Sequence, residues 1–113
     1  MTLRNALRAT CLSLALHCWM PDVLAGDQPA PFADGDAKLG KPIVARDCVA
    51  CHARRMAGDA EKMYLRSDRR VHTPEQLLAQ VSYCNSELGT HYFPDEEAHI
   101  AAYLNAEYYR FKP

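Results

Sequence analysis

The stretch that decides the fold of this 113-residue sequence is RDCVACHARR, residues 46–55. It contains Cys48, Cys51 and His52 in the order C-x-x-C-H. In a helix the two thiols are about one turn apart, and the imidazole follows the second thiol directly. Four explanations of this arrangement have to be compared: a haem, a zinc ion, a redox-active dithiol, and chance.

Covalent haem attachment accounts for all three residues. A haem carries two vinyl groups on neighbouring pyrroles, and two thiols at this spacing can reach both groups and form thioethers. The next side chain then lies under the porphyrin, where a histidine supplies its imidazole to the iron. The motif therefore predicts one covalent haem c per chain, bound by Cys48 and Cys51, with His52 as the proximal iron ligand.

Zinc and dithiol chemistry fit the sequence less well. Structural zinc takes four ligands, usually with a second pair of Cys or His residues. No second C-x-x-C is present, and His91 and His99 are too far apart for the usual spacing of zinc ligands. A thioredoxin-like dithiol needs strands around it, and no stretch of the sequence alternates long enough to predict one.

The first 25 residues predict a secretory signal peptide. Arg4 and Arg8 are followed by a short apolar stretch, and Val23-Leu24-Ala25 forms a small-residue cleavage site. Because the apolar stretch is too short to span a bilayer, we expect a periplasmic protein with no transmembrane segment in the mature chain. An ordinary amphipathic helix at the N-terminus is the alternative.

Cleavage after Ala25 leaves a leader and a domain. Residues 26–36, GDQPAPFADGD, are rich in Pro, Gly and Asp and predict a flexible leader. Residues 37–113 form the expected domain. The chain after Ala25 contains 11 basic and 13 acidic residues, which excludes a polybasic nucleic-acid binder. The basic residues of segment 54–70 form either a solvated surface or a docking patch for a redox partner.

Periodic apolar residues predict an all-α fold of three to five short helices. We expect one helix over residues 36–47, a short one around residues 60–65, and a last one that starts near Pro94 with an acidic first turn. Small domains usually need disulfides, a metal or a large cofactor to fold. Because only three cysteines follow Ala25, at most one disulfide can form, and the size of the domain favours a cofactor.

The clearest helix is expected between Thr73 and Gly89. Thr73 can cap its first turn, Gln76 can complete a capping box, and Gly89 can close the C-terminus. Residues spaced by three and four positions share one face of a helix. The apolar face of this helix is expected to consist of Leu77, Val81, Cys84 and Leu88.

Two segments resemble the small monohaem cytochromes c. Residues 36–52, DAKLGKPIVARDCVACH, are similar to the first helix and haem motif of that family, and residues 96–109, EEAHIAAYLNAEYY, are similar to its last helix. The resemblance implies a small cytochrome c fold around one covalent haem, with the first and last helices in contact. It also implies a carrier of single electrons between redox partner proteins rather than an enzyme. An electron-accepting subunit of a sulfur- or nitrogen-oxide enzyme is a further alternative.

This resemblance does not fix the sixth iron ligand. Ordinary cytochromes c use a methionine well downstream, but Met56 and Met63 are the only methionines after the motif, and Met63 would need an unusually short loop to act as the ligand. The segment around Cys84-Asn85-Ser86 is similar to the SHP-type cytochromes, which bind oxygen-like diatomic ligands. The asparagine ligand of that group and its second cysteine correspond here to Tyr83 and Tyr92. Neither the ligand nor the disulfide can therefore carry over.

The function and the sixth iron ligand both stay open. The alternative to an electron carrier is a diatomic-ligand-binding or sensing haem protein with a weak or open sixth iron position. Cys84 is the first candidate for the sixth ligand, and a thiolate there would donate electron density and lower the potential. A free cysteine on an apolar helix face is also commonly a small buried hydrophobe. His91, just after the helix break at Gly89, is the second candidate.

Overall fold

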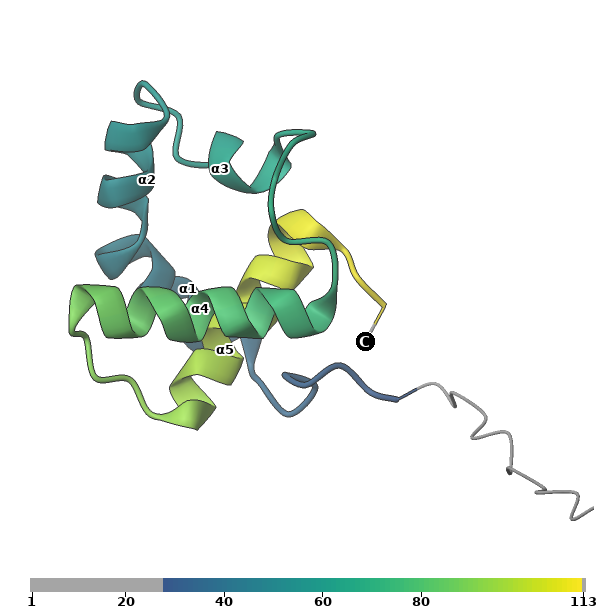
Figure 1. Cartoon of the computed structure of the whole chain (residues 1–113). Coiled ribbons are helices and arrows are strands. Elements are labelled where there is room, and N and C mark those ends of the chain that lie inside the picture. The colour runs from purple at the N-terminus through teal and green to yellow at the C-terminus, as the bar shows by residue number, and fades with distance from the viewer. Residues whose placement is uncertain (1–27, 113) are drawn as a thin grey trace, which may run out of the picture.

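The computed structural model describes residues 28–112, so the predicted signal peptide lies outside the described residues. Within this range the chain forms helices and no strand (Figure 1), which confirms the all-α prediction. The elements are α1 (Ala37–Asp47), α2 (Val49–Arg55), α3 (Lys62–Leu65), α4 (Pro74–Leu88), α5 (Pro94–Leu104) and the π-helix η1 (Asn105–Tyr109). Between residues 28 and 112, no helix combines the length and the apolar character needed to cross a membrane.

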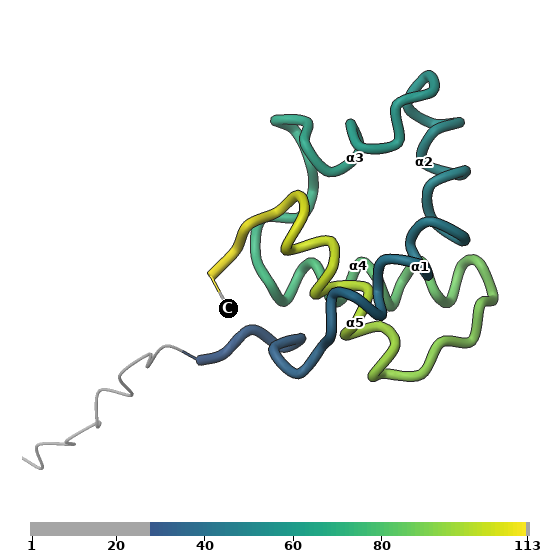
Figure 2. Tube along the Cα trace, turned by 180° about the vertical axis from the view of Figure 1, so that it is seen from behind, coloured from purple at the N-terminus to yellow at the C-terminus, as the bar shows by residue number. Residues whose placement is uncertain are grey.

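Helices α1 and α5 make the largest helix–helix interface, and Figures 1 and 2 show them crossing near the middle of the domain. Gly40 lies in this crossing and is buried. A Cβ atom at Gly40 would lie 2.0 Å from the carbonyl oxygen of His99, so only glycine permits the two backbones to approach so closely. The Asp36 backbone N–H donates to His99 Nδ1 at 2.9 Å at the edge of the same interface.

The expected flexible leader needs correction for the residues that the structure describes. Ala30 and Phe32 are buried and belong to the core. Gly35 packs so closely on α5 that a Cβ atom there would lie 2.2 Å from the Ala98 carbonyl oxygen. Residues 31–34 form a turn, and the described part of this segment packs two apolar side chains against the domain rather than forming a free linker.

Helix α4 begins and ends where the sequence predicts. Thr73 Oγ1 accepts from the Gln76 N–H at 3.2 Å, and Gly89 ends the helix in the left-handed conformation with φ 62°. The capping box differs in one contact, because Gln76 Oε1 accepts from the backbone N–H of His72 at 2.7 Å and not from that of Thr73. The side chain reaches one residue further and still satisfies a backbone donor before the helix.

The core is small. Leu77 is its largest fully buried side chain in the described part of the chain, and Val81 is also buried. Farther along the expected apolar face of α4, Cys84 is only half-buried and Leu88 is 51% exposed. The other core residues are Ala30, Phe32, Val44, Tyr64, Val71, Ile100, Ala101 and Leu104. So few buried side chains support the expectation that the domain needs a further stabilising group.

Asn85 organises the loop between α4 and α5. Its Nδ2 donates to the Tyr92 carbonyl oxygen at 3.0 Å and to Glu97 Oε1 at 2.6 Å. Its Oδ1 accepts from the Tyr92 N–H at 3.0 Å and from Thr90 Oγ1 at 2.7 Å. The Tyr92 hydroxyl donates in turn to Asp47, directly before the first cysteine of the motif. Asn85 therefore connects the loop with α5, and Tyr92 extends the network to the end of α1.

Replacing Asn85 with alanine is expected to destabilise the folded protein by about 2 kcal/mol, because partly buried groups on Tyr92 and Glu97 lose their partners. Chemical denaturation of the purified protein measures this loss. Ser86→Ala is the matched control, since Ser86 is exposed and adjacent, and it should change stability by no more than about 0.5 kcal/mol. Equal effects of the two substitutions would contradict the role of Asn85.

Candidate functional site

The C-x-x-C-H residues lie at the start of α2. Cys48 is the N-cap of this helix, and its carbonyl oxygen accepts from the His52 N–H at 3.2 Å. Residues three and four positions apart share a helix face, so the side chains of Cys48, Cys51 and His52 lie on one face of α2. All three side chains are half-buried, and both thiols are free. The structure therefore brings together the three residues that the sequence singled out.

The His52 imidazole is placed to act as a neutral ligand. Its Nδ1 atom is buried and has no hydrogen-bond partner. Burial lowers the pKa of His52, and the positive charge of Arg55 lowers it further. Since neutral imidazole is the form that binds metals, both effects favour the form of His52 that could ligate iron.

Tyr64 in α3 lies beside this imidazole. The ring centroids of His52 and Tyr64 are 5.0 Å apart with an angle of 68° between the planes. Tyr64 also stacks on Tyr108 with a centroid distance of 4.7 Å. Its side chain is only 5% exposed, yet its hydroxyl has no hydrogen-bond partner. In the described residues His52 Nδ1 and Tyr64 Oη are the two buried side-chain polar atoms without partners, and they belong to neighbouring rings.

Cys84 comes to the same centre from α4. Burial raises the pKa of Cys48 to about 11, and the next largest cause is the proximity of Cys84. Cys84 also contributes to the raised pKa of Tyr64. The half-buried Cys84 Sγ accepts from Gln80 Nε2 at 3.4 Å. In Figure 1 the ribbons of α2, α3 and α4, which carry these groups, lie on three sides of one region.

His91, the second candidate for the sixth ligand, is exposed on the loop between α4 and α5. Its backbone has a positive φ of 57°. Together with loop residues such as Tyr92 and Phe93 it lines a surface cavity of about 520 Å³. The structure does not bring His91 to the group formed by His52, Tyr64 and Cys84.

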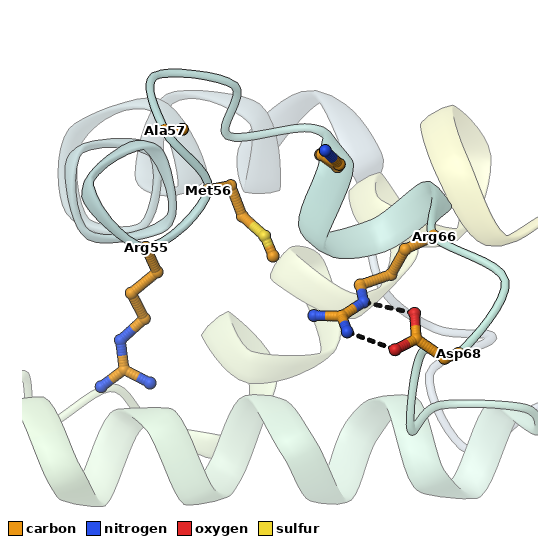
Figure 3. Close-up of a pocket in the computed structure, with 6 residues that line it drawn as sticks. Arg55, Met56, Ala57, Arg66 and Asp68 are labelled. Carbon is orange, nitrogen blue, oxygen red and sulfur yellow. Dashed lines mark hydrogen bonds and ion pairs between the residues drawn. The ribbon is translucent and has the colours of Figure 1, made fainter.

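The two methionines after the motif lie close to the histidine along the chain. Met56 is one helical turn beyond His52, and its N–H donates to the His52 carbonyl oxygen at 3.0 Å. In Figure 3 its side chain lies between the end of α2 and the segment that carries Arg66. It lines a cavity of about 390 Å³ together with Arg55, Ala57, Lys62, Arg66 and Asp68. Met56 is the C-cap of α2, the helix that carries His52. Met63 is half-buried in α3.

The residues at this centre fit a covalently attached haem. Two free thiols and a neutral imidazole share a helix face, and the buried atoms without partners lie beside them. Unpartnered buried polar atoms are rare in native proteins and often mark a missing ligand. Among residues 28–112, no three His, Cys, Asp or Glu side chains are grouped to hold a metal ion by themselves.

Comparisons with protein-family models, with curated proteins and with solved structures found no match for this chain. A functional assignment must therefore be argued from its own residues and their geometry.

Tyr64 is a residue of this candidate site that the sequence did not single out. It is the sole aromatic residue between Ala53 and Val71, in a charged and weakly patterned stretch. Its isolated position in such a segment was the one indication in the sequence that it could belong to the site. Its contact with His52 depends on how the chain between α2 and α3 is folded.

Tyrosine ionisation gives a pH prediction for this aromatic group. Burial and the negative charge of Glu61 raise the pKa of Tyr108 to about 12, and burial also raises the pKa of Tyr109. Because these pKa values are higher in the folded protein than in the unfolded chain, the neutral tyrosines favour the folded state. This contribution to stability is complete below pH ~10, the pKa of tyrosine in an unfolded chain, and is lost as the pH rises through the pKa values of the folded protein.

Denaturation at a series of pH values should therefore show stability falling above pH ~10. Tyr108→Phe should reduce the steepness of this decline. An unchanged slope in that variant would contradict the assigned environment of Tyr108.

Proposed function

We propose that this chain is a periplasmic monohaem c-type cytochrome that carries single electrons between redox partner proteins. The observation that carries the proposal is the placement of Cys48, Cys51 and His52 on one face of α2 beside a buried, unpartnered hydroxyl. The predicted signal peptide supports the compartment, because covalent haem attachment is made on exported chains.

The chain's own residues have defined tasks in this proposal. The thiols of Cys48 and Cys51 would each hold one vinyl group of the haem as a thioether; the S–H hydrogen would go to the vinyl carbon, so the addition would need no oxidant. His52 would hold the iron through its imidazole, and the protein interior surrounds its Nδ1 atom. A bound haem would supply one-electron redox chemistry at this site. We assign no reaction on a further substrate to these residues.

The docking surface for a redox partner is proposed at the cavity after His52. Arg55 and Lys62 line this cavity, and Arg66 pairs there with Asp68 through an Nε–Oδ1 contact of 2.6 Å. A partner with an acidic surface would be attracted to this basic rim. The position, one turn beyond the proximal histidine, would keep the distance for electron transfer short.

One observation favours a second candidate function, the binding or sensing of a diatomic ligand. Met56 and Met63 both lie close to His52 along the chain, and this sequence has no methionine well downstream of the motif, where ordinary cytochromes c have their ligand. An iron without a strong sixth ligand can accept a small molecule in that position.

Optical spectra of the purified, matured protein separate these functions. An electron carrier should give a low-spin reduced spectrum that carbon monoxide does not change. A high-spin ferrous spectrum that shifts with carbon monoxide would contradict the electron carrier and support the ligand-binding protein. Absence of any haem spectrum would reject both.

A further inference from the structure

We propose that Cys84 supplies the sixth iron ligand, with Gln80 orienting its sulfur and Tyr64 as a hydrogen-bond donor facing it. This inference rests on the proposed haem function, and it deepens that function by naming the group that closes the iron site. It makes the iron centre a His52/Cys84 pair.

The position of Cys84 on α4 points to this role. On the other flank of the helix, Ser82 and Asn85 both bond to the Glu97 carboxylate of α5. At about 100° per residue, Cys84 and Gln80 lie on the flank that α5 does not occupy. The sulfur is therefore not used in packing α4 on α5.

The surroundings of the sulfur suit a ligand rather than an inert core cysteine. The side chain is half-buried and already accepts a hydrogen bond from Gln80 Nε2 at 3.4 Å. In Figure 1, α4, which carries Cys84, lies across from α3, which carries Tyr64, with α2 and the haem motif at one side. The sulfur therefore belongs to a helix that lies opposite the tyrosine that contacts His52.

The Tyr64 hydroxyl is an independent indication of a ligand. It is 5% exposed as a residue, its ring contacts His52 and Tyr108, and its oxygen has no partner. A buried hydroxyl usually has an acceptor. A thiolate on the iron would be such an acceptor, and hydrogen bonds to a ligating sulfur tune the properties of the metal.

The other candidates are less well placed. His91 is exposed on the loop after α4, and Met56 follows His52 on the same helix. Cys84 combines a metal-binding atom, a position on a different helix from His52, and a hydrogen bond from Gln80 to its sulfur.

Ferric spectra of the holoprotein test the assignment. The unmodified protein should show a low-spin ferric centre with thiolate charge-transfer absorption. Cys84→Ala should keep the covalent haem, lose that absorption and become high-spin, whereas His91→Ala should match the unmodified protein. A Cys84→Ala holoprotein with an unchanged ferric spectrum would overturn the proposal. If neither the unmodified protein nor any variant contains haem, the proposed function itself is wrong. That result differs from an unchanged spectrum of the Cys84→Ala holoprotein.

A second measurement tests the ligation of Cys84 without the Cys84→Ala variant, which is useful if that variant does not fold. Alkylation of Cys84 by iodoacetamide in the unmodified ferric holoprotein should be slow and should accelerate by about tenfold or more when cyanide displaces the sulfur. A rate that cyanide does not change would contradict ligation.

Tyr64→Phe tests the positioning role of Tyr64. It should shift the midpoint potential in the unmodified protein but not in the Cys84→Ala background. Equal shifts in both backgrounds would assign Tyr64 a structural role only.

Discussion

Replacing both Cys48 and Cys51 with alanine is expected to abolish covalent haem attachment, which would be the largest effect of any substitution considered. Both proposed thioethers depend on these sulfurs, which share a helix face with His52, the proposed iron ligand. Denaturing electrophoresis followed by detection of haem in the protein band measures the loss. Haem retained by the double variant would contradict the assigned attachment.

Cys84→Ala is the matched control for this experiment. It removes the third cysteine of the described chain, which is also free and half-buried, but it leaves the C-x-x-C-H motif intact. The variant should retain haem in the denatured band. Loss of haem from Cys84→Ala to the same extent would show that haem attachment does not depend specifically on the two cysteines of the motif.

Gly40→Ala is expected to produce the largest loss of stability from a single added methyl group. The new Cβ atom would meet the His99 carbonyl oxygen at 2.0 Å and the carbonyl carbon at 2.5 Å. Because the obstruction is backbone rather than a flexible side chain, α1 and α5 must separate. We expect a cost of about 3 kcal/mol or more, at the upper end for overpacked cores, measured by chemical denaturation.

Ala45→Ser controls for the effect of changing α1 itself. Ala45 is exposed on the same helix and should tolerate the hydroxyl with a change of about 0.5 kcal/mol or less. If Gly40→Ala were as stable as Ala45→Ser, the close crossing of α1 and α5 would not exist in solution.

The features that sequence could predict depend on neighbouring residues. Thr73 caps α4 through the N–H of Gln76, three residues away, and Gly89 ends the helix through its own conformation. The motif places Cys48 and His52 on one face because helical spacing alone requires it. These contacts need no information about distant segments.

The features that sequence did not reveal depend on contacts between distant segments. Phe32 looked like part of a leader, because its Pro- and Gly-rich surroundings resemble a linker and its burial depends on the rest of the domain. Tyr64 contacts His52 and stacks on Tyr108, which lies far along the chain. The hydrogen bonds of Asn85 likewise depend on the path of the loop that it holds. Composition and periodicity carry no signal for such contacts.

The most direct test of the central claim is the intact mass of the chain under denaturing conditions, after expression with export and haem-attachment machinery. We predict the mass of the processed polypeptide plus one haem, with a red colour that persists after unfolding. A colourless, well-folded product with the mass of the polypeptide alone would contradict the account.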